Sequence, residues 1–387
     1  SGNKILDRTN NGNIATTLTS GINIPGGTTP GDAEIVDVVD PIWEKVSSSA
    51  YAFNPTDKTK SIAEITFKGT DSYFANSTLT SDKIKVFVDG TEVTSGITKK
   101  LSTAKSLEEQ RKEFGKPSTI TKQYGIEYTL TLEGWSQNAQ QVKIQLPEGT
   151  IIDESENKNK QTDLIVFNQL RKTDTETTET SAFLGNTKVQ RQNVDNVTFV
   201  DNIPSAVYDK TTNQITDSTA WDVSARQDKS IIAWYETETS GALKVYIGSN
   251  DEIFANQNST NLFAYIGKNS KCTSTETITN ISLLNVDSVT NMQGMFKSTG
   301  YKAMTKLDFG NKFNTSNVTN MKEMFKETGY TAMTTLKLES GFNTINVTDM
   351  SNMFEECGRK LMTDLDLGDN FNTFNVTTMN SMFKACG

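Results

Sequence analysis

Hydrophobic residues recur every 29 positions over the last quarter of the chain. Valine stands at positions 289, 318, 347 and 376, and a Met-Phe pair follows each valine six residues later. All eleven methionines fall into three such columns. A period of this length predicts stacked units that bury one another's apolar faces. A methionine-rich ligand site is the alternative, but a shared core explains every position of the columns.

The pattern inside one period predicts two elements. Val318, Met321 and Phe325 are spaced as one apolar face of a short helix, with Asn317 or Thr319 as its N-cap and Gly329 at its left-handed end. Leu336-Lys337-Leu338 alternates as a short strand. One strand and one helix per period predict a leucine-rich-repeat solenoid over residues 276–387, with residues 221–275 as its N-terminal cap.

The repeat motifs are specific enough to suggest a family. The segments FNTSNVTNMKEMF and FNTINVTDMSNMF resemble the BspA-like leucine-rich repeats of bacterial surface proteins. That resemblance implies an adhesin that binds host matrix proteins or other cells. We also expect the natural protein to continue beyond Gly387 with further repeats and an anchor.

The front half alternates with the period of a β-strand. Ile84, Val86 and Val88 alternate and end at Asp89-Gly90, a hairpin signal. Further strands are expected near residues 62–67, 126–132, 142–146, 151 and 164–167, and a charged helix at 106–114. These strands predict a β-sandwich over 51–168, and the sequence from Ser61 to Val93 resembles a bacterial immunoglobulin-like module. Residues 1–50 are predicted to be an N-terminal segment and linker, and 169–220 a connecting segment. The expected fold class is thus mixed β and α/β.

Composition excludes several functions. The 387 residues carry a net charge of −9, which disfavours nucleic acid or an anionic lipid surface as the partner. There is no histidine, so histidine-dependent catalysis and the usual zinc sites are excluded. Three cysteines cannot form a disulfide framework. No apolar run reaches the roughly 18 residues of a membrane span. These features favour a binding protein over an enzyme, and we predict no cofactor.

Exposed positions of the predicted strands are the candidate binding residues. They alternate with the buried positions, and their charge changes from unit to unit. They are Lys306, Asp308, Thr335, Lys337, Asp364 and Asp366. A merely solvated sheet face with cross-strand charge pairs remains an equal alternative.

Two other features carry weaker hypotheses. Asp153, Ser155, Asn157 and Asn159 place oxygen donors at alternate positions, as in a calcium loop, but the glycine and final glutamate of such loops are missing. Cys357 and Cys386 lie one period apart. Parallel side chains on neighbouring units meet poorly as a disulfide, so we expect free thiols.

Together these observations predict a secreted surface protein of a Gram-positive-type bacterium. It would bind an extracellular protein or glycan of a host or a neighbouring cell through its repeats. One alternative is a self-associating subunit of a surface layer or filament, in which residues 1–50 pair with a neighbour's sheet edge. Another is an uncharacterised hydrolase with paired carboxylates.

Overall fold

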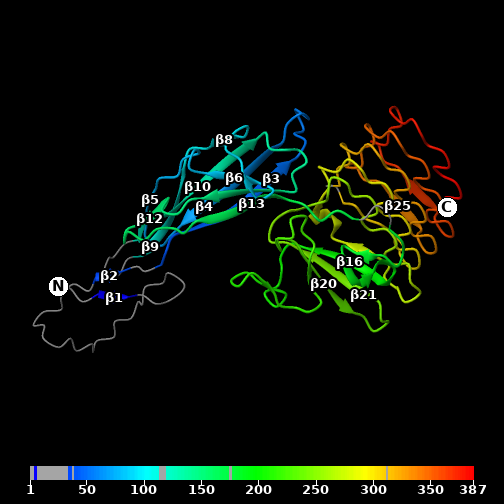
Figure 1. The fold of residues 1–387 in the computed structure, drawn as a ribbon, viewed down its shortest axis with the longest axis horizontal. Helices are drawn as coiled ribbons and strands as arrows, with labels where there is room; N and C mark the ends of the chain where they lie inside the picture. Colours follow the sequence, from blue (N-terminus) through cyan, green and yellow to red (C-terminus); the bar gives the residue numbers. More distant parts are fainter. Residues whose placement is uncertain (1–3, 7–33, 37–38, 113–118, 174–176, 311–312) are drawn as a thin grey trace, which may run out of the picture. The chain divides into compact units, whose positions relative to one another are not determined.

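The chain forms two compact units in the computed structural model (Figure 1). The structure describes residues 4–6, 34–36, 39–112, 119–173, 177–310 and 313–387. The first unit comprises Ser1–Ala50, Ser61–Trp135 and Lys143–Val166, and the second comprises Tyr51–Lys60, Ser136–Val142 and Phe167–Gly387. Much of the N-terminal segment and linker predicted at 1–50, namely residues 1–3, 7–33 and 37–38, lies outside the described residues.

The first unit is built from β-sheets. A five-stranded sheet has the order β3 (Ile42–Tyr51), β4 (Ile62–Thr70), β10 (Thr119–Glu133) and β8 (Thr98–Leu101), and β9 (Lys105–Lys112) also pairs with β10. A second sheet has the order β13 (Thr162–Asn168), β11 (Gln141–Leu146), β6 (Lys85–Val88) and β7 (Thr91–Glu92). Smaller pairs join β5 (Phe74–Ser77) to β12 (Ile151–Asp153), and β1 (Lys4–Leu6) in parallel to β2 (Glu34–Val36).

Strand alternation predicted these elements well, because one face of each strand is buried. Ile65, Phe67, Leu130 and Leu132 are all almost fully buried. The helix predicted at 106–114 is wrong: Lys105–Lys112 is strand β9, paired with β10 from Lys105↔Glu127 to Lys112↔Thr119. An isolated helix of this length is marginal in water, whereas the extended edge of β10 offers a complete set of hydrogen bonds.

The second unit starts from a mixed sheet. Its order is β19 (Trp221–Asp222), β20 (Ile232–Thr237), β21 (Leu243–Gly248), β16 (Val194–Val200) and β23 (Ile278–Thr279). The central strand β16 is parallel to both of its neighbours, and its Val197 and Phe199 are fully buried. Around it lie β14 (Ala182–Phe183) with β15 (Asn186–Gln190), β17 (Tyr208–Asp209) with β18 (Gln214–Ile215), and β22 (Ile253–Phe254) with β24 (Leu284–Asn285).

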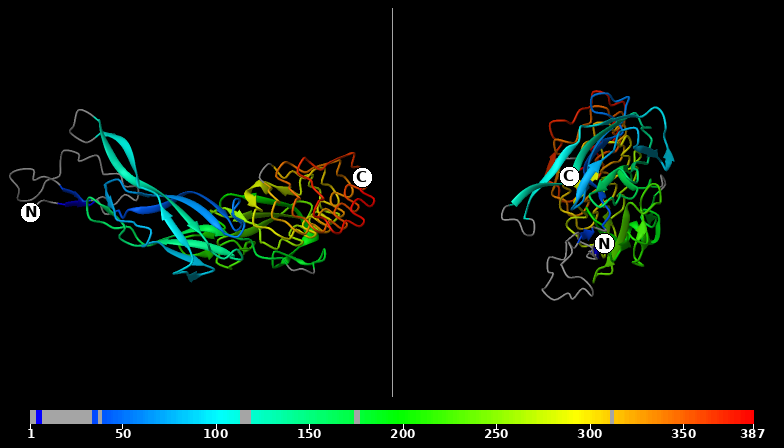
Figure 2. Two further views of the ribbon diagram at one scale, coloured as in Figure 1. Left: turned by 90° about the horizontal axis from the view of Figure 1, so that it is seen from above. Right: turned by 90° about the vertical axis from the view of Figure 1, so that its left-hand side faces the viewer.

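Residues 259–387, called the repeat stack below, pile successive 29-residue units on one another (Figure 2, yellow to red). In each unit four backbone N–H groups donate to carbonyls of the next unit. The N–H groups of Met321, Glu323, Phe325 and Glu327, for example, donate to the carbonyls of Asp349, Ser351, Met353 and Glu355 at 2.8–3.0 Å. The strands β25 (Thr335–Lys337) and β26 (Asp364–Asp366) pair in parallel on another side of the units.

The predicted fold class, with a capped leucine-rich-repeat solenoid of mixed α/β character, is wrong. The described residues contain no α-helix, only the 3-10 helices η1 (Arg191–Asn193) and η2 (Ile281–Leu283). The segment 318–328, expected to be helical, is a series of tight turns in which Glu323 and Glu327 have positive φ values of 56° and 58°. Alternate N–H groups there bond the next unit, so they are not available for an α-helical ladder.

The repeated apolar columns do form the core, as predicted. Met321, Met324 and Met333 are fully buried. The phenylalanine rings stack from unit to unit, with centroids 5.6 Å apart for Phe296 and Phe325 and 5.3 Å apart for Phe325 and Phe354. Each unit therefore buries its apolar face against the next.

A buried arginine lies at the first turn of the stack. Arg191 is 0% exposed, and its Nη1 donates to the carbonyls of Asn261, Leu262 and Ala264 at 2.8, 3.1 and 3.1 Å. The carbonyls of Leu262 and Ala264 correspond to those that accept from a preceding unit deeper in the stack. The guanidinium therefore supplies donors to carbonyls that have no preceding unit.

Candidate binding face

The six candidate residues lie on neighbouring units of the repeat stack. Lys306 and Asp308 belong to residues 304–310, which form no regular element, and the other four belong to β25 and β26, where Thr335 faces Asp364 and Lys337 faces Asp366. Thr335 is half-buried and the others are exposed. Leu307 and Leu336, between the candidates, are buried. The structure thus brings the predicted residues together on one face, here called the strand face.

Ion pairs join the units across this face. Lys306 Nζ lies 3.1 Å from a carboxylate oxygen of Glu276, and Lys337 Nζ lies 3.9 Å from one of Asp364. All four side chains are more than half exposed. Such solvent-exposed pairs add little to stability, so replacing these residues should leave the fold intact.

Two grooves flank the segment 304–310. The first, of about 300 Å³, lies between residues 276–282 and 306–310, and its lining includes Ile278, Ile281 and Phe309. The second, of about 380 Å³, lies between residues 305–308 and 334–339. Lys306 and Asp308 line both grooves, so the two form one continuous depressed surface.

The grooves exist because neighbouring segments diverge. The N–H of Thr334 donates to the carbonyl of Thr305 at 3.1 Å. Beyond that bond, among the described residues, no backbone hydrogen bond joins 306–309 to 335–338. Within the described part of the chain, strand β25 pairs only with β26.

Polar ladders hold the units at a fixed spacing. The side-chain amides of Asn317, Asn346 and Asn375 each donate to a carbonyl of the preceding unit at 2.6–2.7 Å. Thr319 and Thr348 hydroxyls donate in the same direction, each at 3.1 Å. Asn317 and Thr319, predicted as helix caps, are therefore links between units.

Sequence reasoning missed several lining residues, notably Glu276, Asn280 and Glu339. In the unit that contains Glu276, the strand is β23, Ile278–Thr279, and Ile281-Ser282-Leu283 is the 3-10 helix η2. Glu276 aligns with Thr305, Thr334 and Thr363, outside the columns of the candidate residues, so the repeat pattern does not single it out. Glu339 aligns with Gly310 and Gly368 of the neighbouring units, so no charge recurs at this position of the repeat that could have identified it as a groove residue.

The proposed calcium loop is folded around internal hydrogen bonds. Asp153, 2% exposed, accepts from the N–H groups of Ser155 and Asn157 at 2.8 and 2.7 Å and from the Asn157 amide at 2.7 Å. Asn159 is buried and bonds the backbone around it. Among the described residues, no cluster of cysteine and carboxylate side chains is arranged to hold a metal ion.

The three cysteines are free thiols. Burial, and to a lesser extent Asp195, raises the pKa of Cys272 to about 12, and burial raises the pKa of Cys386 to about 11. Burial also raises the pKa of Cys357. These thiols are poor nucleophiles at neutral pH.

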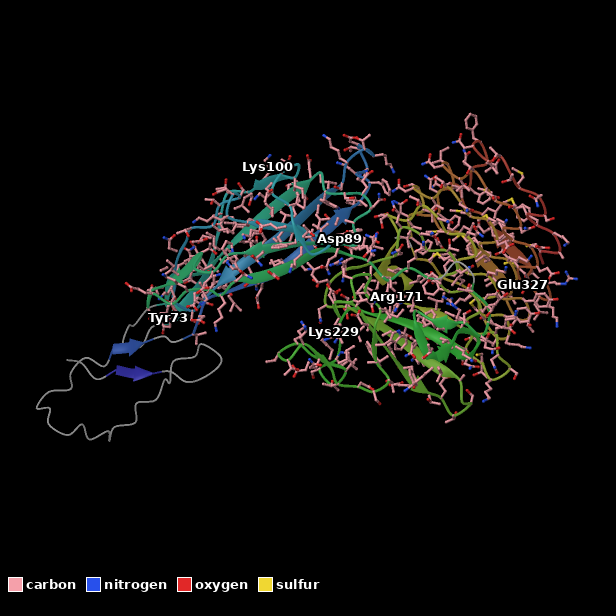
Figure 3. The ribbon with its side chains drawn as sticks, viewed as in Figure 1. Tyr73, Asp89, Lys100, Arg171, Lys229 and Glu327 are labelled. Carbon is pink, nitrogen blue, oxygen red and sulfur yellow. The ribbon has the colours of Figure 1, made fainter. Side chains whose placement is uncertain are left out.

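Charged side chains also lie on the turns of the repeat stack that include Glu327 (Figure 3). Glu355 accepts from Lys326 at 2.6 Å and from Lys384 at 2.8 Å, and these ammonium groups lower the pKa of its carboxyl. The carboxylate of Glu355 is thus paired with ammonium groups of the units on both sides of it. No helix among the described residues is long and apolar enough to cross a membrane.

Comparison with known proteins covers the repeat stack only. Residues 267–387 match a family model described as "Mycoplasma protein of unknown function, DUF285". No curated protein and no solved structure matches the chain. The resemblance to BspA-like leucine-rich-repeat proteins with an immunoglobulin-like domain is therefore corrected, because the matching family is a different one and the described residues of the units hold no α-helix. The repeat region is similar to this DUF285 family.

Proposed function

We propose that this chain is a bacterial surface protein that binds an extracellular protein or glycan through the strand face. The observation that carries the proposal is the pair of grooves on a face whose charges differ from unit to unit, set on buried columns that repeat. Such a surface can vary in chemistry while its frame stays fixed. Concave surfaces with convergent polar groups are the usual place for a ligand.

Location at the cell surface belongs to the same proposal. A macromolecule of a host or a neighbouring cell is reached only from outside. The family that residues 267–387 match is described from Mycoplasma, which agrees with a bacterial source. Brief protease treatment of intact cells should remove this chain while a cytoplasmic marker survives, and survival of both would contradict the proposed location.

Binding is tested with an array of extracellular-matrix proteins, mucins and glycans. The full chain is compared with a variant carrying Lys306→Ala, Lys337→Ala, Asp364→Ala and Asp366→Ala. A matched control carries Lys188→Ala, Lys210→Ala, Glu148→Ala and Asp201→Ala, all exposed positions away from the grooves. Both variants leave the net charge unchanged.

The expected result is a hit that the first variant loses and the control keeps. A hit kept by both variants would place the binding surface elsewhere and contradict the role of the strand face. If no hit appears and the chain instead assembles with rising concentration, the recognition function is wrong and a self-associating structural role replaces it.

A further inference from the structure

The strand face carries more acid than base. With the groove residues Glu276 and Glu339 included, its carboxylates belong to Glu276, Asp308, Glu339, Asp364 and Asp366, and its ammonium groups to Lys306 and Lys337. Asp364 and Asp366 lie on β26, next to β25, and line neither groove. Five carboxylates against two ammonium groups leave an excess of three negative charges. Because the lysines pair with Glu276 and Asp364, the excess lies on Asp308, Glu339 and Asp366.

Two of these three carboxylates are held in place. Asp308 accepts from the N–H of Gly310 at 2.9 Å, and Asp366 accepts from the N–H of Gly368 at 3.0 Å. Both side chains are exposed, and each uses one oxygen for the turn. The turns fix the direction of the carboxylates, so a partner meets a preformed pattern of negative charge.

The backbone around the second groove adds a separate constraint on the partner. Residues 306–309 alternate exposed and buried side chains as a strand does, residues 335–337 are strand β25, and among the described residues no backbone hydrogen bond closes the gap between them. Extended segments with open edges accept an added strand, which gains main-chain hydrogen bonds. The apolar lining from Leu307, Ile281 and Phe309 can hold aliphatic parts of its side chains.

We propose that the two grooves bind an extended peptide segment of a partner protein that carries lysine or arginine at alternate positions. Alternate side chains of an extended segment point to the same side, so its cations would face the carboxylates while its backbone pairs along the groove. This inference rests on the proposed function and names the partner class for the same face.

The test uses the full chain and four labelled nine-residue peptides in fluorescence anisotropy. One alternates threonine with lysine, one threonine with glutamate, and one threonine with glutamine. The fourth is the lysine peptide with prolines at two threonine positions, which removes backbone donors. We expect the lysine peptide to bind at least tenfold more tightly than the others and to weaken as salt is raised.

The matched variants locate the site. Asp308→Asn, Glu339→Gln and Asp366→Asn together should weaken the lysine peptide by about tenfold, since each partly exposed charge pair contributes modestly. The control variant carries Glu64→Gln, Glu148→Gln and Asp201→Asn, which make the same charge change at exposed positions outside the grooves. It should bind as the parent does.

Failure of this inference is distinguishable from failure of the proposed function. Tighter binding of the glutamate or glutamine peptide, abolished by the Lys306/Lys337/Asp364/Asp366 alanine variant, overturns the basic partner but keeps the face. If the Asp308/Glu339/Asp366 variant binds the lysine peptide as tightly as its control variant does, the grooves are not the binding site. If no peptide binds while array hits still depend on the face, the peptide partner is wrong and the recognition function stands.

Discussion

At the scale of single residues, the polar residues of the repeat hold the units together as the apolar residues do. Thr299 and Thr328 are fully buried, and their hydroxyls donate at 2.7 Å to the carbonyls of Phe263 and Phe296 in the preceding unit. The same column holds Cys357 and Cys386. The sequence pattern indicated only that this column needs small side chains, because a hydrogen-bond partner in another unit leaves no local signal.

Thr328→Val should lower the free energy of unfolding by about 1 kcal/mol, since it removes a buried hydrogen bond without changing the side-chain shape. Thr348→Val removes a hydrogen bond of 3.1 Å at an exposed position and should cost less than about 0.5 kcal/mol. Urea unfolding of both variants measures the difference. Equal losses of unfolding free energy in the two variants would mean that burial does not determine the strength of these threonine hydrogen bonds between units.

The raised pKa values of the buried thiols predict how stability depends on pH and how slowly these thiols react with an alkylating reagent. A thiol whose pKa is raised in the folded chain stabilises the fold while it is protonated. This contribution is full below the unfolded-state pKa, about 9, and is lost as the pH rises through about 11 for Cys386 and about 12 for Cys272. At pH 8 we expect the native thiols to react about a hundredfold more slowly with iodoacetamide than the urea-unfolded chain.

Mass spectrometry of the alkylated chain provides the measurement, with the unfolded chain as its control. Cys386, half-buried, should be modified before Cys272 and Cys357. Alkylation of native Cys386 at the unfolded rate would contradict the raised pKa.

At the scale of elements, periodicity predicted what is buried better than what is helical. The valine, methionine and phenylalanine columns lie in the core except at Met379 and Phe383, and most strands of the first unit lie where alternation indicated. The spacing of Val318, Met321 and Phe325 also fits a chain of tight turns, so it does not specify a helix. The outcome is decided by hydrogen bonds to neighbouring units, which are non-local and cannot be read from one period. The same limit applies to the site, because the strand-face residues could be named but their grooves could not.

Gly329 marks the end of the turns, where a left-handed residue was expected. Its φ is +56°, and a Cβ there would lie 2.4 Å from Cβ of Met333. Gly329→Ala should therefore lower the free energy of unfolding by about 3 kcal/mol, from backbone strain and the overlap together. The overlap repeats at Gly300 and Gly358, against Met304 and Met362.

Gly149→Ala separates the two causes. Gly149 has a φ of +73°, but its nearest neighbour, Cδ of Lys158, would lie 3.6 Å away. This control should show only the backbone term, about 1–2 kcal/mol. Equal losses for the two variants in urea unfolding would show that the Met333 contact relaxes freely.

At the scale of the whole molecule, the two compact units are not two continuous stretches of sequence. Residues Tyr51–Lys60 and Ser136–Val142 lie between strands of the first unit but belong to the second. Gln140 accepts from the N–H of Gln169 at 3.0 Å, and the amide of Gln141 donates to Asp228 at 2.6 Å. A boundary drawn between residues 168 and 169 therefore cuts through the second unit.

A fragment covering 169–387 should unfold at a temperature about 5–10 °C below the second unit in the full chain. It lacks these hydrogen bonds and also Phe167, whose ring centroid lies 4.4 Å from that of Phe254. Differential scanning calorimetry measures both transitions, and Phe167→Ala in the full chain should reproduce part of the shift. An unchanged midpoint would show that the intervening segments add nothing to the second unit.

The direction of the hydrogen bonds between units has an electrical consequence. In the ladder of the tight turns each N–H points toward the following unit, so the peptide dipoles of this ladder add along the stack, whereas Thr319, Gly329 and Thr334 donate toward the preceding unit at other positions. The carbonyl end of the ladder carries partial negative charge, and the guanidinium of Arg191 lies there against three carbonyls. A cation at that pole is stabilised by the terminal carbonyls of the ladder. Since only the terminal groups are uncompensated, that stabilisation stays nearly constant whether the stack gains or loses a unit.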